Sequence, residues 1–137
     1  MSTAQPDVLP VRQTKEETKA FYNKIAKVYD LLAERTEQPI RDTSFQELAP
    51  KPIGSGGRAF GIDLAESMVA IARKTMNKAE CADWVDLRCG DAEQLPYEAE
   101  SMDAVVMNFT LELFDTPNIQ LVLGEIHRVL RREGRVV

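Results

Sequence analysis

The sequence has few of the residues that build metal centres or disulfide frameworks. Its 137 residues include two cysteines, Cys81 and Cys89, and one histidine, His127. Two cysteines with no second pair predict neither a zinc site nor a disulfide framework, so we expect free thiols in a reducing compartment. We expect His127 to lie at the surface or rim of the fold rather than to act in catalysis.

The sequence also lacks a long apolar run and a basic surplus. No run approaches the ~18–20 residues of a membrane span. The net charge is −5 and the pI is near 5.0, which argues against a nucleic-acid partner because such proteins need a basic face. The polar start, MSTAQPDVLP, has no apolar core of a signal peptide. We therefore expect a cytoplasmic protein with no membrane span.

The first third of the chain predicts a lead-in and two helices. The length suits one domain or part of one. Residues 1–13 predict a flexible lead-in. Thr14 and Glu17 have the spacing of a capping box, which predicts a helix over about 15–35. A weaker helix is expected at about 38–48, ended by the prolines that follow.

A glycine-rich stretch follows at 53–57, with the sequence IGSGG. A phosphate-binding glycine loop follows a strand and opens a helix, so that amides at the helix end face the anion. Here the glycines follow a helix and two prolines and precede a strand. We therefore interpret this stretch as a turn.

The rest of the chain alternates strand and helix patterns, which predicts an α/β fold with helices on both faces of the sheet. Strands are expected at 59–62, 85–90, 102–109 (of the doubly buried type) and from 136, and helices at 66–78 and from Thr116 to about Arg132, with Gly134 after the last helix.

The predicted buried faces of the two later helices follow their apolar spacing. For the helix at 66–78 they are Met68, Ile71, Ala72 and Met76. For the last helix they are Ile119, Val122, Leu123, Ile126, Val129 and Leu130. Met68 has a second interpretation, since its flexible thioether also suits a flat ligand ring.

Two strands end at an acid, and this is the main functional signal. Asp63 follows the first strand and Asp91 follows the second. Ligands of open α/β sheets bind at the carboxyl ends of the strands, and a carboxylate accepts strong hydrogen bonds from ribose hydroxyls. The layout predicts a nucleotide site. A nicotinamide dinucleotide is the weaker alternative, because no G-x-G-x-x-G precedes the first acid.

The sequence resembles the class I S-adenosylmethionine-dependent methyltransferases, in particular the branch of ubiquinone and menaquinone biosynthesis C-methyltransferases. The resemblance runs from Phe21 to Val137 through FYNKIAKVYD, GIDLAESM, CGDAEQLPYEAESMDAVVMNFTLELF and HRVLRREGRVV. It implies a Rossmann-like, mostly parallel sheet with flanking helices, incomplete relative to the family. Residues 14–137 would form a partial methyltransferase domain, with lid helices at 14–50 and the α/β core at 58–137.

The resemblance implies S-adenosylmethionine as the cofactor. Asp63 would hold its ribose hydroxyls, with Leu64 and Met68 beside the adenine. Asp91 would accept from the adenine amino group, and the Ala92 N–H would meet a ring nitrogen.

The resemblance also implies methyl transfer to a small-molecule or lipid-like acceptor. Asn108 and Phe109 would lie near the sulfonium and the entering substrate, while Tyr22 and Tyr29 would close the lid. A structural alternative for both tyrosines is a buried ring with a solvated hydroxyl. The reaction is an in-line attack that depends largely on orientation, so no catalytic residue and no metal is implied.

One part of the family pattern is absent. Residues 48–52 resemble the approach to a first strand and residues 53–58 resemble the turn after the next helix. The strand, its glycine-rich loop and the helix between them are missing. Losing two or three backbone hydrogen bonds of that loop would cost about 1.5–4 kcal/mol of cofactor binding. We expect either direct pairing of the strands at 59–62 and 102–109 or an unpaired seam in the sheet. The alternative function is a shortened, inactive relative that self-associates through open sheet edges.

Overall fold

A computed structural model describes residues 13–36, 57–80, 82–108 and 110–137. At residues 27–36 it describes the backbone alone. Its elements are α1 (Lys15–Thr36), β1 (Ala59–Asp63), α3 (Glu66–Lys78), η1 (Ala82–Trp84), β2 (Val85–Cys89), β3 (Met102–Val105), η2 (Leu111–Leu113), α4 (Thr116–Val129) and β4 (Leu130–Val136). The expected helix at 38–48 and nearly all of the lead-in and the glycine-rich turn lie outside the described residues.

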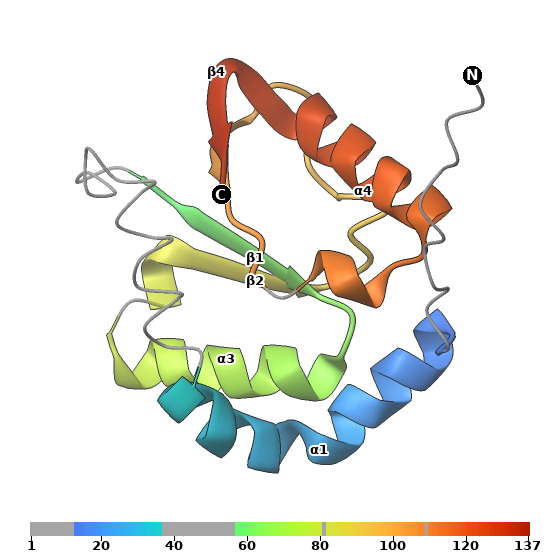
Figure 1. Cartoon of the computed structure of the whole chain (residues 1–137). Coiled ribbons are helices and arrows are strands. Elements are labelled where there is room, and N and C mark those ends of the chain that lie inside the picture. Colours follow the sequence, from blue (N-terminus) through green and yellow to red (C-terminus); the bar gives the residue numbers. More distant parts are fainter. Residues whose placement is uncertain (1–12, 37–56, 81, 109) are drawn as a thin grey trace, which may run out of the picture.

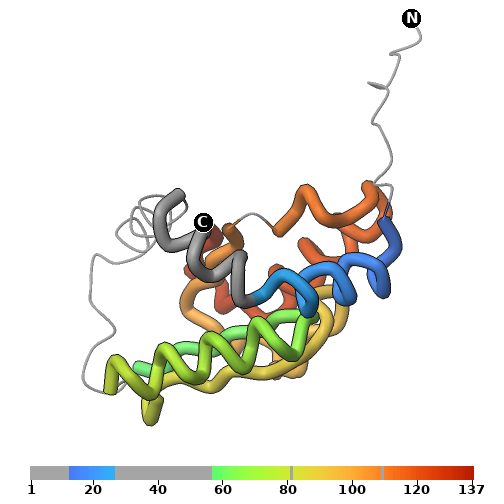
Figure 2. The backbone as a smooth tube through the Cα atoms, turned by 90° about the horizontal axis from the view of Figure 1, so that it is seen from below, coloured from blue at the N-terminus to red at the C-terminus, as the bar shows by residue number. Residues whose placement is uncertain are grey.

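The elements form an α/β arrangement. Figure 1 shows α3 against the pair β1–β2 and α1 beside α3, while α4 lies on the other side of that pair together with β3 and β4. Figure 2, turned by 90°, shows the same neighbours. This arrangement confirms the predicted fold class. The capping box is confirmed as well, since Glu17 N–H donates to Thr14 Oγ1 (3.2 Å) and Thr14 N–H donates to Glu17 Oε2 (2.8 Å).

The strands form two separate parallel pairs. β1 pairs with β2 from Ala59 opposite Val85 to Asp63 opposite Cys89, and β3 pairs with β4. In the part of the chain that the structure describes, no ladder joins β1 to β3. Of the two sheet arrangements expected from the sequence, the described strands therefore show the unpaired seam.

Few apolar side chains are fully buried, and most of them are alanine or valine. Among the described residues they are Ala26, Ala65, Val69, Val122, Ile126 and Val129. On α3 the predicted face is only half-buried, and Val69, which the sequence prediction missed, is the side chain that packs most deeply.

On α4 the prediction was right for Val122, Ile126 and Val129 and wrong for Leu123, which is 45% exposed. Successive helical residues are about 100° apart, so Leu123 lies off the stripe that contains its neighbour Val122.

One predicted boundary of the last helix was wrong. α4 begins at Thr116 as predicted, with Asp115 as its N-cap and Pro117 in its first turn. The helix ends at Val129 and β4 begins at the next residue, so Gly134 lies inside the strand instead of following the helix. A Cβ there would lie 2.9 Å from the Arg131 carbonyl oxygen, so the irregular part of β4 requires a glycine.

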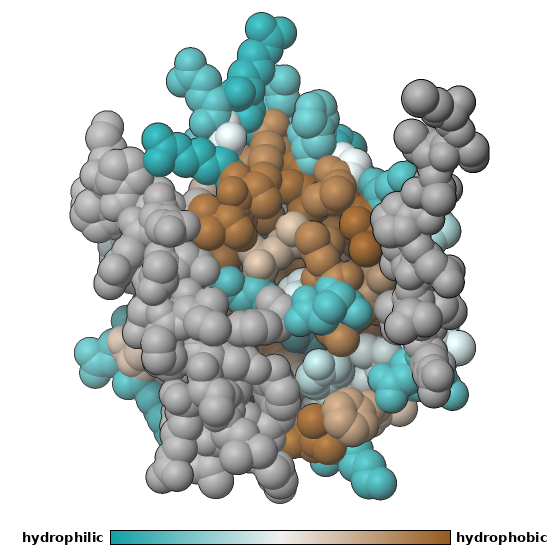
Figure 3. Space-filling view, viewed as in Figure 1, coloured by the Kyte–Doolittle hydropathy of each residue, from teal (hydrophilic) through white to brown (hydrophobic). Residues whose placement is uncertain are grey.

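The third strand is shorter and more exposed than predicted. β3 ends at Val105 rather than at 109, and Asp103 and Ala104 are exposed, so it is not buried on both faces. Figure 3 shows apolar side chains gathered at the surface around α4, β3 and β4. Leu121 is 55% exposed and Val136 is 47% exposed. The described part of the chain thus leaves apolar side chains of α4 and β4 exposed.

Replacing Ile126 by alanine tests the small core. Ile126 is 4% exposed, so Ile126→Ala should lower the free energy of unfolding by about 2–4 kcal/mol, measured by urea denaturation. Leu121→Ala, on the same helix but 55% exposed, is the matched control and should change it by less than about 0.5 kcal/mol. Equal effects of the two variants would contradict this assignment of the core.

Candidate functional site

The ladder between β1 and β2 brings the two acids to one edge of the sheet. Asp63 ends β1 opposite Cys89, and its carbonyl oxygen accepts a 2.9 Å hydrogen bond from the Gly90 N–H. Asp91 is the next residue. The two strand ends that carry the acids are therefore adjacent. Gly90 is needed for close packing, because a Cβ there would lie 2.8 Å from Ile62 Cδ1.

Asp63 has unused hydrogen-bonding capacity. Its Oδ1 accepts the Ala65 N–H at 2.7 Å, and the described residues offer no donor to Oδ2. Partial desolvation by the surrounding protein raises the pKa of Asp63, although the residue stays exposed and the Ala65 N–H acts in the opposite direction. The site therefore holds a carboxylate that an incoming hydroxyl group can still reach.

Asp91 is held by a lysine from α1. Lys15 Nζ lies 2.6 Å from Asp91 Oδ2 and 2.8 Å from Glu93 Oε2. The Glu93 N–H donates to Asp91 Oδ1 at 3.0 Å. Desolvation raises the pKa of Asp91, but the hydrogen bonds from Lys15 and Glu93 and the charge of Lys15 outweigh it, so that the pKa is lowered.

A second contact joins α1 to the start of α3, beside Asp63. Lys19 Nζ lies 2.5 Å from Glu66 Oε1, and Asn23 Nδ2 donates to Glu66 Oε2 at 3.1 Å. The Lys19 hydrogen bond, the backbone N–H of Glu66 itself and Asn23 lower the pKa of Glu66 to about 2. Helix α1 thus contacts the chain just after both strand ends.

Four other predicted site residues lie in two different parts of the fold. Leu64, Met68, Ala92 and Asn108 are half-buried; the first three adjoin the two acids along the chain, and Asn108 follows β3 in the other sheet. The segment after β3 leads to η2.

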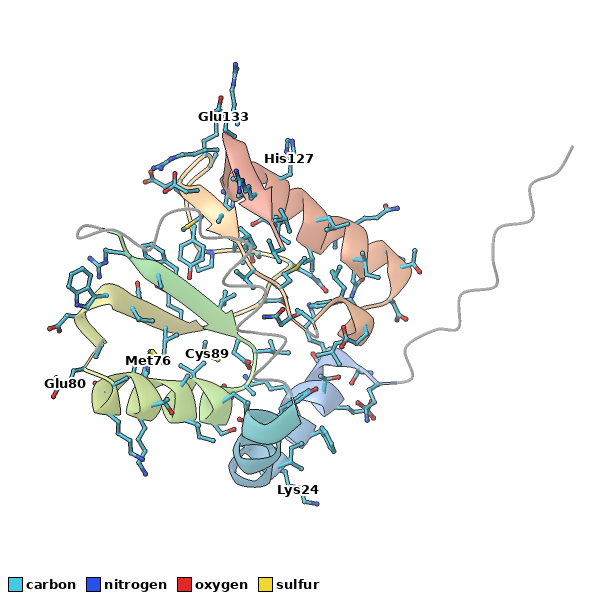
Figure 4. All side chains as sticks on the ribbon, turned by 60° about the vertical axis from the view of Figure 1, so that its left-hand side comes forward. Lys24, Met76, Glu80, Cys89, His127 and Glu133 are labelled. Atoms are coloured by element: carbon cyan, nitrogen blue, oxygen red, sulfur yellow. The ribbon has the colours of Figure 1, made fainter. Side chains whose placement is uncertain are left out.

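Of the aromatic residues, Tyr22 is half-buried and stacks edge-on against Phe21, with ring centroids 5.6 Å apart. The Tyr29 side chain and Phe109 lie outside the described residues. His127 is exposed and points away from the fold in Figure 4, as expected for a surface histidine.

The residues present fit the adenosine half of S-adenosylmethionine. Asp63 Oδ2 is an accessible acceptor for a ribose hydroxyl. Beside Asp91, the buried Glu93 Oε1 has no partner in the described part of the chain, so a polar donor is still lacking there. No glycine-rich loop lies at these strand ends among the described residues. The fit therefore extends to the adenosine and not to the methionine end.

The described hollow of about 260 Å³ lies elsewhere. Its lining residues come from the carboxyl half of α3, from η1 and from the amino end of β2: Arg73, Met76, Asn77, Ala82, Val85, Asp86 and Leu87. Figure 4 shows Met76 between α3 and the strands. The hollow thus lies at the opposite end of β2 from Asp91. The described residues contain no cluster of side chains that would hold a metal ion and no helix long and apolar enough to cross a membrane.

The sequence analysis missed Lys15, Lys19 and Asn23. These residues are spaced by four, which places polar side chains on one face of α1. This stripe was the available signal. Its partners, Glu66 and Glu93, follow the two strand ends.

The Lys15 contact makes stability depend on pH. The pKa of Asp91 in the folded chain lies below its ordinary 3.8, so the ion pair stabilises the fold above pH 3.8 and its contribution is lost as the pH falls through the lower value. Lys15→Met should lower the free energy of urea unfolding by about 0.5–1 kcal/mol at pH 7, with the difference closing below pH 3.8. Lys24→Met, an exposed change on the same helix, is the control. A difference that persists unchanged to pH 2 would contradict the role of Asp91.

Comparisons with known proteins match this chain to a family. The sequence pattern of the family described as "Methyltransferase domain" matches residues 43–137, more than half of the chain. The demethylmenaquinone methyltransferase of Lactobacillus johnsonii is 35% identical over 86 residues, which are 63% of this chain and 34% of that protein. The chain spans about a third of the length of the curated relatives that it matches first.

Solved structures support the same fold. A protein from Methanococcus maripaludis superimposes with a TM-score of 0.70 at 19% identity, over 83% of this chain and 61% of that one. An S-adenosylmethionine-dependent methyltransferase from Aquifex aeolicus superimposes with a TM-score of 0.50 at 28% identity, over 58% of this chain and 40% of that one. The predicted family resemblance and Rossmann-like fold class are confirmed, and S-adenosylmethionine is supported as the cofactor.

Proposed function

This chain belongs to the family of methyltransferase domains, and on that premise we propose that it binds S-adenosylmethionine at the carboxyl ends of β1 and β2 and takes part in methyl transfer to a small or lipid-like acceptor. The observation that carries the proposal is the pairing of Asp63 and Asp91 at adjacent strand ends, with Asp63 Oδ2 left available by the described residues.

Asp63 would hold the ribose. A carboxylate accepts two hydroxyl donors in parallel, and charge-assisted hydrogen bonds are about twice as strong as neutral ones. Desolvation of Asp63, which raises its pKa, would strengthen these hydrogen bonds. A carboxylate that has lost part of its hydration is stabilised more by each new donor. Leu64 and Met68 would then lie beside the adenine.

Asp91 would accept a hydrogen bond from the adenine amino group while its ion pair with Lys15 is kept. Its Oδ2 bonds Lys15 and its Oδ1 bonds the Glu93 N–H, so the amino group would have to use a remaining lone pair of one of these oxygens. The Ala92 N–H would meet a ring nitrogen. We therefore expect the adenine to contribute less affinity than the ribose.

The bound cofactor would supply a methyl group activated on its sulfonium. The chain would contribute orientation, since holding the reactants in line accounts for much of such an acceleration. Asn108 and Phe109 would border the reacting end, and Tyr22 and Tyr29 on α1 would restrict access of water. The demethylmenaquinone methyltransferases among the relatives support a quinone-like acceptor for this chain.

Substitution of Asp63 separates binding from folding. Asp63→Ala should weaken S-adenosylhomocysteine by about 10- to 100-fold, because two bonds to a charged acceptor are lost. Asp63→Asn should weaken it less and should raise the Tm, since the folded chain disfavours the charge on Asp63, whose pKa is raised, and the amide removes that charge. Isothermal titration and thermal unfolding measure the two effects.

The matched control for Asp63 is Asp83→Asn, an exposed acid in η1 at the amino end of β2. It removes the same charge and should leave the affinity unchanged. The proposed site is wrong if the wild-type chain gives no heat with millimolar S-adenosylhomocysteine. It is also wrong if Asp83→Asn lowers the affinity for this ligand as much as Asp63→Asn does.

A second candidate function is association without chemistry. It is favoured by the two separate strand pairs, because the described ladders leave edges of β1 and β3 that a second copy of the chain would pair with. Sedimentation velocity tests it: a dimer that binds no S-adenosylhomocysteine would support association, whereas a monomer that binds the ligand would exclude it.

A further inference from the structure

The start of α3 lacks a cap of its own. The N-cap residue, Ala65, has the extended backbone of a capping position (φ −94°, ψ 116°) but a methyl side chain that makes no cap hydrogen bond. Ser, Thr, Asp and Asn are the usual residues there because their side-chain oxygens accept one of the open N–H groups of the first turn.

Asn23 of α1 supplies the missing acceptor from another helix. Its Oδ1 accepts the Ser67 N–H at 2.9 Å and the Ser67 hydroxyl at 2.5 Å. The side-chain amide donates to Glu66 at 3.1 Å, and Lys19, one turn earlier on α1, forms an ion pair with the same carboxylate. One face of α1 therefore completes the first turn of α3.

The capped turn is continuous with Asp63. The Ala65 N–H donates to Asp63 Oδ1 at 2.7 Å, so the orientation of this carboxylate depends on the N-cap residue of α3. Asn23 lies eight residues after Lys15, which is about 12 Å along a helix, and Lys15 holds Asp91. A shift of α1 would thus disturb both acids together.

We propose that Asn23 is a positioning residue for the cofactor site, because it caps α3 from α1 and so couples the docking of α1 to the orientation of Asp63. The inference rests on the proposed function. A cap supplied by another helix differs from a local cap in one testable respect, since restoring the cap within α3 repairs the helix but not the docking of α1.

The experiment compares Asn23→Ala with Asn23→Ala/Ala65→Ser in the full chain. Asn23→Ala should lower the Tm by on the order of 4 °C, speed hydrogen exchange in residues 15–26 and 63–69, and weaken S-adenosylhomocysteine about 10-fold. Serine at position 65 provides a local cap. The double variant should therefore recover the Tm and the protection of 63–69, while exchange in 15–26 stays fast and the ligand stays weak.

Lys24→Ala is the matched control, because Lys24 is exposed, adjoins Asn23 and points away from the fold in Figure 4. It should leave exchange and affinity unchanged. Ala65→Ser alone should show a Tm no lower than wild type, which establishes that serine fits at this buried position.

The inference is overturned if the double variant binds S-adenosylhomocysteine like wild type, since Asn23 would then be only a helix cap. It is also overturned if Asn23→Ala leaves exchange in 15–26 unchanged. Absence of ligand binding in wild type would refute the proposed function instead, and the exchange data would still decide whether Asn23 couples α1 to the Asp63 segment.

Discussion

The parallel ladder between β1 and β2 is the constraint on which the site depends. Its last hydrogen bond, from the Gly90 N–H to the Asp63 carbonyl oxygen, fixes the register that places Asp63 beside Asp91. Side chains alternate between the faces of a strand, so a shift of one residue would reverse every side chain of β1 or β2. Gly90 allows the close contact with Ile62 that this register requires. The adjacency of the acids is thus a property of the backbone.

Helix α1 adds the second layer of the site. Its polar face makes an ion pair with Asp91 through Lys15 and completes the first turn of α3 through Asn23. These interactions are partly exposed, and ion pairs of that kind contribute little to stability individually. Their effect is to give α1 one position relative to both acids. The helix that the family resemblance describes as a lid is therefore in contact with the proposed adenosine site.

The sequence was sufficient to predict local structure and the strand-end acids. Capping residues, apolar spacing and the acids after each strand are local signals, and the helices α1 and α3 have almost the predicted bounds. Errors arose where tertiary context decides. Leu123 belongs to the apolar set of α4 but lies off the stripe that is buried, and β3 is shorter and more exposed because its sheet has only two described strands. The contacts of Lys15 and Asn23 link residues far apart in sequence, so helical spacing indicated a polar face but not its partners.

The most direct test of an adenosine site at these strand ends is a titration of the isotope-labelled chain with adenosine, followed through its backbone amide NMR signals. Adenosine lacks the methionine end, for which the described residues offer no loop, so it isolates the half of the cofactor that the acids would hold. The proposal predicts saturable shifts confined to the amides of residues 63–68 and 90–93, and no comparable shifts with free methionine. Shifts centred instead on the hollow lined by Arg73 and Asp86, or none at millimolar adenosine, would contradict it.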